Sequence, residues 1–370
     1  PNTPINDLMV HEREHDLVVA TSGRSFWILD ELQPLRQAAR VDEGEPHLFA
    51  PGHVYRWAGG GGFGGGGEGQ NPPNGAVIDF VLGDDFGVGG QNAGGGDDAA
   101  AGEDGEAGAS SEVSIEILTA AGDLVRTLST APDDAVSPGA SPLRVGPGAN
   151  RVVWNLRHEA IPNIPGAYVF GSLQGRRVVP GDYQVRLTVG DWSMTQPLEV
   201  RMDPRLDVPL SAYIEQDRFV AEVANELAAI HRAVSVNNDV RGQIETAMER
   251  IGEHDGTESL VAEGETLAGD LETVADSLYQ RRTVDGQTVI NFPTRLKFQY
   301  VFLHGNADAD QPGVSMGSRD VLRDLRARWT VHQAANEELL GPRLDAFNRM
   351  LGDAGFSVVI VPPRPPRPIS

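Results

Sequence analysis

The residues whose types and spacing come nearest to a known chemistry lie close to the start of the sequence. His11-Glu12-Arg13-Glu14-His15 matches the pattern H-E-x-x-H. On a helix this spacing places both imidazoles on one face, where zinc peptidases bind Zn²⁺ beside a catalytic glutamate. Here the motif separates the apolar runs LMV and DLVVAT, so a hairpin loop between two strands is expected in place of a helix. A zinc peptidase is therefore the most distant hypothesis, and no metal-binding residue is assigned.

Other catalytic patterns are present only in fragments. Nine of the eleven residues of Gly59–Gly69 are glycine and match G-x-G-x-x-G, but no helical pattern follows, as a phosphate-binding loop requires. There is no G-x-S-x-G elbow, and the absence of cysteine excludes a cysteine nucleophile and thiolate metal sites. Carboxylates are plentiful, so a glycosidase-type pair of carboxylates stays open. Sialidases also use a cluster of arginines, but no motif brings together Arg24, Arg151 and Arg157, which are scattered along the sequence. We predict no catalytic residue, no cofactor-binding residue and no cofactor.

The net charge narrows the choice of partners. The 370 residues include 53 acidic and 30 basic side chains, which gives a formal net charge of −23. A protein that binds nucleic acid or anionic lipid needs a basic face, so neither partner is expected. No apolar run approaches the ~20 residues that span a bilayer, so membrane insertion is not expected. Lys297 is the single lysine of the chain, and every other basic residue is arginine.

Three short strands follow one another at the start of the chain. The segments Ile5–Val10, Asp16–Thr21 and Ser25–Asp30 are apolar runs separated by turn residues, which is typical of a β-meander. Three strands alone are marginally stable and leave their edges open. Residues 1–33 are therefore interpreted as an incomplete part of a larger all-β body, namely the last blade of a β-propeller.

A family resemblance supports this interpretation. The run NDLMVHEREHDLVVATSGRSFWILDELQPLRQ resembles the closing blade of BNR (Asp-box) repeat, sortilin-like or sialidase-like β-propeller proteins, which are bacterial and glycosyl-hydrolase-like. Later segments resemble the C-terminal portion of the same family: HLFAPGHVYRW, NPPNGAVIDFVL, VRTL, GANRVVWNLRHE, PGDYQVRLTVGDWSMTQPLEVRMDPR and FPTRLKFQYVFLHGNAD. The Asp-box itself is degenerate, because Thr21–Trp27 keeps the glycine and the aromatic residue but lacks the aspartate. The resemblance implies a secreted, periplasmic or cell-surface location.

The middle of the chain is predicted to be rich in β-structure. Residues 34–75 are expected to form a connector with a Gly-rich linker, and residues 76–203 an immunoglobulin-like β-sandwich with Trp154 in its core. The polar and apolar alternation of Tyr183–Val189 is the period of a half-buried strand. Residues 83–112 contain eight acidic residues and no lysine or arginine, so this insert is expected to be disordered. The irregular segment Arg157–Val179 is a candidate binding loop.

The apolar spacing changes to a helical period in residues 204–355. Steps of three and four residues predict an antiparallel helical bundle, with Ser211 as the first N-cap. Breaks are expected near Asn237-Asn238 and near Gly341-Pro342, and Arg295–His304 is expected to form a shorter helix. The stripes comprise Val220, Val223, Leu227, Ile230 and Val234; Val240, Ile244, Met248 and Ile251; Leu260, Leu267, Leu271, Val274 and Leu278; Val321, Leu325 and Trp329; and Leu340, Leu344, Phe347 and Leu351. Residues 356–370 are expected to form a Pro-rich tail.

These observations predict a multidomain α+β chain and one leading function. The leading hypothesis is a non-catalytic extracytoplasmic structural and interaction module that completes or caps a sortilin-like β-propeller and binds protein or glycan partners. Its expected partner is a propeller-bearing polypeptide, either another chain or the N-terminal part of the same precursor. The alternative is a part of a secreted glycosidase or sialidase-like hydrolase. In that case the resemblance implies an active centre on propeller blades that this chain lacks.

Overall fold

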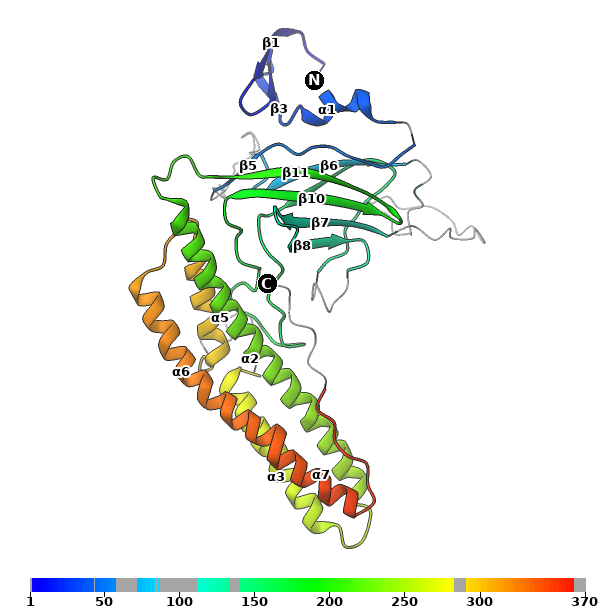
Figure 1. The fold of residues 1–370 in the computed structure, drawn as a ribbon, viewed down its shortest axis with the longest axis vertical. Helices are drawn as coiled ribbons and strands as arrows, with labels where there is room; N and C mark the ends of the chain where they lie inside the picture. The colour runs from blue at the N-terminus through cyan, green and yellow to red at the C-terminus, as the bar shows by residue number, and fades with distance from the viewer. Residues whose placement is uncertain are drawn as a thin grey trace, which may run out of the picture. The chain divides into compact units, whose positions relative to one another are not determined.

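The computed structural model describes residues 2–42, 44–57, 72–83, 86, 112–132, 140–282 and 291–362. It shows a mixed α/β chain with several β-sheets and a C-terminal group of helices (Figure 1). The chain divides into two compact units. The β unit comprises the described residues within Pro1–Asp134, Ala140–His158 and Val178–Asp207, and the helical unit comprises those within Glu159–Arg177 and Val208–Ser370.

The first sheet of the β unit is the N-terminal sheet, formed by three consecutive strands. These are β1 (Ile5–His11), β2 (Asp16–Thr21) and β3 (Phe26–Leu29), paired antiparallel in the order β1-β2-β3. The three strands expected within residues 1–33 are therefore present. A short helix, α1 (Gln33–Gln37), and a 3₁₀ turn, η1 (Ala38–Arg40), follow the sheet.

Two further sheets complete the β unit. One has five strands in the order β5-β11-β10-β7-β8, and the other has three strands in the order β4-β6-β9 (Figure 1). All neighbouring strands are antiparallel except β5 and β11, which are parallel. The strands are β4 (His47–Leu48), β5 (Val54–Arg56), β6 (Ala76–Leu82), β7 (Val113–Thr119), β8 (Leu124–Ser129), β9 (Gly148–Trp154), β10 (Gly181–Val189) and β11 (Trp192–Met202).

One hydrophobic core is shared by these two sheets. Alternate residues of β6 are buried, as are alternate residues over most of β7, which is the period that a sheet with one covered face requires. Ile78 and Phe80 from β6 join Ile115 and Ile117 from β7 in this core. Trp154 is 1% exposed, so its predicted place in the core is confirmed.

The connector predicted for residues 34–75 is partly wrong. Residues of this segment form β4 and β5, which join the edges of the two sheets. Val54 pairs with Val200, and Leu48, which pairs with Phe80, is fully buried. Strands of two or three residues carry no period of their own, so pairing with distant strands determines them. The Gly-rich run Gly59–Gly69 lies outside the described residues, as does the insert 83–112 apart from Gly83, Phe86 and Glu112.

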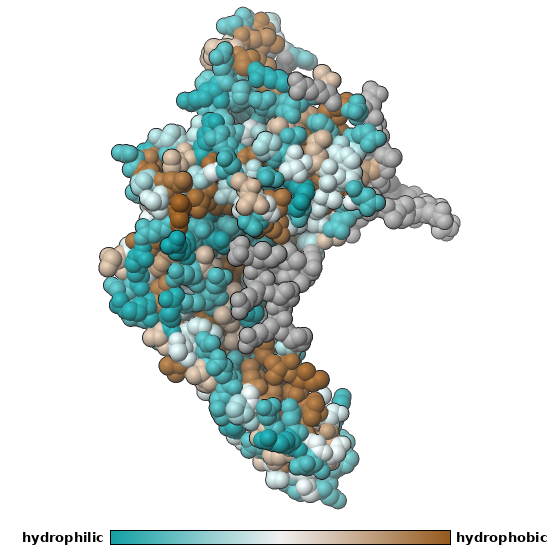
Figure 2. All heavy atoms as spheres, viewed as in Figure 1, coloured by the Kyte–Doolittle hydropathy of each residue, from teal (hydrophilic) through white to brown (hydrophobic). Residues whose placement is uncertain are grey.

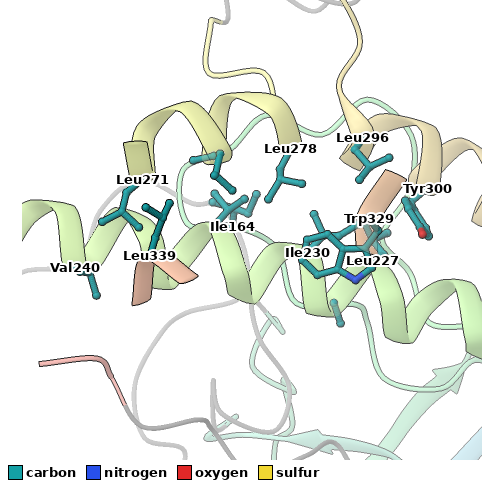
Figure 3. Packing of buried hydrophobic residues seen from close by; sticks show 14 of the residues in the cluster. Ile164, Leu227, Ile230, Val240, Leu271, Leu278, Leu296, Tyr300, Trp329 and Leu339 are labelled. Carbon is teal, nitrogen blue, oxygen red and sulfur yellow. The ribbon is translucent and has the colours of Figure 1, made fainter. Parts of the chain in front are cut away.

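The described part of the helical unit contains four long or medium helices and a final short one. Their stripes of apolar residues pack into a single core, part of which Figure 3 shows around Leu227, Ile230 and Trp329. In the drawing, Leu278 and Ile164 also point into this core. The helices are α2 (Leu210–Ile251), α3 (Glu258–Leu278), α5 (Leu296–Ala307), α6 (Met316–Glu338) and α7 (Leu344–Asp353), with the π-helical turn η2 (Leu339–Arg343) between the last two.

The helices differ from the prediction in the continuity of α2, in its N-cap and in the buried stripe of α6. Helix α2 runs unbroken through Asn237-Asn238, because apolar residues on both sides of the pair continue one buried stripe. Its N-cap is Pro209, two residues before the expected Ser211, and its first helical residue is Leu210. In α6 the expected stripe residue Val321 is exposed, and its neighbour Leu322 is buried together with Leu325 and Trp329, at steps of three and four residues.

The interruption expected near Gly341-Pro342 is confirmed. The π-helical turn η2 contains Pro342, which cannot donate a backbone hydrogen bond within a regular helix. The short helix expected at Arg295–His304 is also present as α5. After α7, Val359 is buried and exchanges two hydrogen bonds with the amide of Asn348. Residues 363–370 lie outside the described residues.

The segment Glu159–Arg177 is the main departure from the predicted domain order. It was expected inside the sandwich of residues 76–203, yet it belongs to the helical unit. Ile161 and Ile164 are buried in the helical core. The segment is irregular, as predicted, and its apolar residues are covered by helices that come later in the sequence.

Candidate functional site

The N-terminal sheet carries an unusual concentration of exposed apolar side chains. Every residue of β1 and β3 is exposed, with Phe26 72% and Ile28 60% accessible. Figure 2 shows hydrophobic residues gathered over the strands that Figure 1 labels β1 and β3. The exposed apolar residues are Ile5, Leu8, Met9, Val10, Phe26, Trp27, Ile28 and Leu29. Monomeric proteins seldom expose such a cluster unless it contacts a partner.

The strand register places apolar residues on both faces of this sheet. Leu8 pairs with Val19, which pairs with Trp27, so these three side chains share one face. Met9, Val18 and Ile28 form the adjacent row on the opposite face. The first face also carries Val10, Leu17 and Leu29, and the second carries Ala20 and Phe26. A sheet with one solvated face would alternate apolar with polar residues, and this sheet does not.

The H-E-x-x-H motif lies in the hairpin turn of this sheet, as predicted. His11 ends β1 and pairs with Asp16, and the His15 N–H donates to the His11 carbonyl at 2.8 Å. The Glu14 N–H donates to Nδ1 of His11, and Glu14 also contacts Arg13 and His53. The backbone bond from His15 to His11 closes a single turn, and the positive φ of His15, 61°, shows that the motif does not lie on a regular α-helix. Among the described residues, no group of three or more His, Cys, Asp or Glu side chains is arranged to hold a metal ion.

A charged cluster in the β unit was not found from the sequence. Arg151 donates two hydrogen bonds to Asp79, at 2.7 and 2.9 Å, across the β6–β9 pair. Burial and the neighbouring Asp79 raise the pKa of Glu31, and burial and Asp16 raise the pKa of Asp30. The three arginines that were scattered in the sequence are not brought together, since among them only Arg151 belongs to this cluster. Pairing of Asp79 with Arg151 becomes evident only from the strand register.

Buried polar groups in the helical unit hold the segment Glu159–Arg177. Lys297 is 6% exposed, and its Nζ donates to Oδ1 of Asn163 at 2.9 Å and to the Tyr168 carbonyl at 3.3 Å. Nδ1 of His231 lies 2.5 Å from the Pro162 carbonyl. Burial lowers the pKa of Lys297 to about 8 and that of His231 to about 4. The composition identified Lys297 as the single lysine but gave no sign of its burial.

Lys297 lines a cavity of about 50 Å³ whose other walls are largely aromatic. The cavity lies where Glu159–Arg177, the end of α3 and the start of α5 meet. Tyr168, Phe170, Tyr279, Phe292 and Phe298 contribute rings. Arg295, the N-cap residue of α5, also lines it.

A larger hollow lies between α2 and α6, but its charges are mostly paired. It has a volume of about 480 Å³ and four arginines among its lining residues. Arg319 pairs with Glu215, Arg326 with Glu222 and Glu226, and Arg323 with Asp320. Two of these arginines therefore hold α6 to α2, as is common for exposed ion pairs between helices.

Comparisons with protein-family models, with curated proteins and with solved structures find no match for this chain. None of the helices that the structure describes combines the length and the apolar character needed to cross a membrane. The candidate sites are therefore judged on their own geometry: the two-faced N-terminal sheet, the carboxylate cluster around Arg151 and the aromatic cavity at Lys297.

Proposed function

We propose that this chain is a non-catalytic interaction module whose N-terminal sheet forms a terminal blade of a β-propeller carried by another polypeptide segment. The observation that carries the proposal is the apolar character of both faces of the sheet. One face presents Leu8, Val19 and Trp27, and the other presents Met9, Val18 and Ile28.

The two-faced pattern favours a propeller over other β architectures. In a sandwich, each sheet buries one face and leaves the other in water, so its strands alternate. In a propeller, blades are arranged around a central channel, and a blade lies between two neighbours. Both faces of a blade are then covered. Blades typically have four strands, and the N-terminal sheet has three, with β1 and β3 as its edges.

The remaining parts of the chain fit a supporting role in this proposal. We interpret the two larger sheets as an immunoglobulin-like sandwich, because they share one core. The helical unit is interpreted as an antiparallel bundle. The proposed location is extracytoplasmic, in line with the family resemblance of the N-terminal run.

A photo-cross-linking experiment tests the proposal separately for the two faces of the N-terminal sheet. Phe26 and Trp27 are consecutive residues of β3, so their side chains point to opposite faces. Each position is replaced in turn by p-benzoylphenylalanine, and the protein is irradiated in its native source. Leu35 of α1, which is 64% exposed but outside the sheet, is the matched control position.

The proposal predicts adducts from both Phe26 and Trp27 to two different segments of one strand-rich polypeptide, and none from Leu35. Sequencing of the adducts then identifies the neighbouring blades. Adducts from one face alone contradict the propeller interpretation, because a sandwich partner covers a single face. Adducts only to further copies of this chain, or no adducts from either face, also overturn it.

A further inference from the structure

The start of helix α5 combines charges that a helix N-terminus does not favour. Helix N-termini carry a partial positive charge, so anionic side chains are stabilising there and cationic ones are not. Arg295 is the N-cap residue of α5, Lys297 is its second residue, and the first turn contains no acidic residue. No side chain caps the helix at this end. Two cations therefore lie where a negative charge is preferred.

Neither cation has a carboxylate partner among the described residues. Lys297 donates to two neutral oxygens, Asn163 Oδ1 and the Tyr168 carbonyl. A protonated amine has three N–H donors, so one is left over. The Nε atom of Arg295 is also buried without a hydrogen-bond partner among the residues described. In a chain with a net charge of −23, this local excess of positive charge needs a reason.

Both cations line the same aromatic cavity. Its volume of about 50 Å³ limits the size of a ligand, and its walls, which include Tyr168, Phe298 and Val301, favour a ligand with an apolar part. Because a water-sized group needs roughly 10–15 Å³ of such volume, the cavity holds about three to five non-hydrogen atoms. The ligand should therefore be small, with a negatively charged end and a short hydrocarbon part.

We propose that this cavity binds a short-chain aliphatic monocarboxylate of the size of propionate. Its carboxylate lies between the Lys297 ammonium, the Arg295 guanidinium and the first N–H groups of α5, and its alkyl chain contacts the aromatic walls. The carboxylate supplies the acceptor that the remaining Lys297 N–H lacks. Hydrogen bonds between charged partners are about twice as strong as neutral ones, which gives the site its selectivity for an anion.

The pH dependence of binding follows from the ammonium. Burial lowers the pKa of Lys297 to about 8, so the free protein loses this charge as pH rises through that value. Within the described part of the chain, the other titratable groups that line the cavity are Arg295, Tyr168 and Tyr279, and His231 of α2 is close enough to Lys297 for their charges to interact. None of them is a carboxylate. Binding is expected to weaken as pH rises above about 8 and to be accompanied by proton uptake near that pH.

Isothermal titration calorimetry with sodium propionate on the full chain tests the proposal. Propionamide is the neutral ligand of the same shape, and sodium chloride at equal ionic strength controls for screening. The variants are Lys297→Met and Arg295→Gln. Arg323→Gln, at an arginine of α6 with a 72% exposed side chain, is the matched control.

The expected result is saturable binding of propionate, no binding of propionamide, and at least ~10-fold weaker binding in Lys297→Met and in Arg295→Gln. Arg323→Gln should bind as the unchanged protein does. If Lys297→Met fails to fold by circular dichroism, Arg295→Gln and the pH profile of the unchanged protein decide the question. Equal binding of propionate and propionamide, unchanged affinity in Arg295→Gln, or no saturable binding by folded protein overturns the proposal.

Discussion

Glu31 is a carboxylate whose surroundings favour its protonated form. Its pKa is raised by burial and by Asp79, although the Gly52 N–H and Arg151 oppose the shift. A raised pKa means that the folded state binds more protons than the unfolded state, so stability falls as pH rises through the titration range. Glu31→Gln removes this dependence and is expected to raise the Tm of the β unit.

The gain in Tm is expected at pH 7, above the titration range of this carboxyl. Differential scanning calorimetry between pH 4 and pH 8 measures it, and the gain should shrink toward acid pH. Glu45→Gln, at an exposed position, serves as the control and should change little. A loss of stability in Glu31→Gln would show that the carboxylate is stabilised as an anion.

His231 is the second residue for which the structure predicts a pH effect. It is 2% exposed, and burial, together with the positive charge of Lys297, lowers its pKa to about 4. A pKa below the ordinary value of 6.5 means that the helical unit loses stability as pH falls from about 6.5 to about 4. The free energy of unfolding should fall by about 3 kcal/mol over this range, because one unit of pKa shift corresponds to about 1.4 kcal/mol.

The measurement is urea unfolding of the unchanged protein and of His231→Asn at several pH values. His231→Asn keeps an amide donor close to the position of Nδ1, which contacts the Pro162 carbonyl, but cannot titrate. The stability difference between the two proteins should therefore change by about 3 kcal/mol over this pH range. Parallel curves for the two proteins would contradict the assignment of a neutral imidazole.

At the scale of elements, α2 contains a buried amide near its middle. Asn237 is 1% exposed, and neither its Nδ2 nor its Oδ1 has a hydrogen-bond partner among the described residues. An unpaired buried amide costs free energy, and leucine has nearly the same size and a better helix propensity. Asn237→Leu should therefore stabilise the helical unit by about 1–3 kcal/mol in urea unfolding.

A matched change is Asn237→Asp, which places a charge in the same apolar surroundings and should destabilise strongly. If Asn237→Leu is instead destabilising, the amide has a partner, such as a buried water, that the continuous helix must accommodate.

Helix α3 offers two glycines that differ only in their neighbours. A Cβ at Gly269 meets no atom within 4 Å, whereas a Cβ at Gly264 lies 2.3 Å from Sδ of Met248 on α2. Gly269→Ala should stabilise by about 0.5–1 kcal/mol through helix propensity. Gly264→Ala should lose at least that gain, because the side chain of Met248 must move. Thermal unfolding of both variants measures the difference, and equal gains would mean that α2 and α3 separate freely there.

At the scale of the whole molecule, the sequence predicts best those elements whose period lies within contiguous residues. Helix α3 and strand β10 are such cases, because the apolar stripe of α3 and the alternation of apolar and polar residues in β10 each extend over several residues. Strands β4 and β5 are too short for a period, and they exist because distant strands pair with them. The site at Lys297 is similar, since its partner Asn163 lies 134 residues earlier in the chain.

The division into two units is the feature least visible in the sequence, because Glu159–Arg177 leaves the β unit and returns to it. Its covered residues, Ile161 and Ile164, belong to the helical core although they lie between strands β9 and β10. An irregular segment has no period to show which core it enters. Contacts with helices that come later in the chain determine where its apolar residues are buried.

This assignment predicts that single core substitutions act on one unit at a time. Ile164 is 1% exposed in the helical core, and Ile117 is fully buried in the β core. Replacing a buried isoleucine by alanine costs about 2–5 kcal/mol. In hydrogen exchange, Ile164→Ala should lower amide protection in α2 and α3 and leave β7 and β10 unchanged, and Ile117→Ala should do the reverse. Equal loss in both units after Ile164→Ala would contradict this prediction, because it would show that the two units unfold as one.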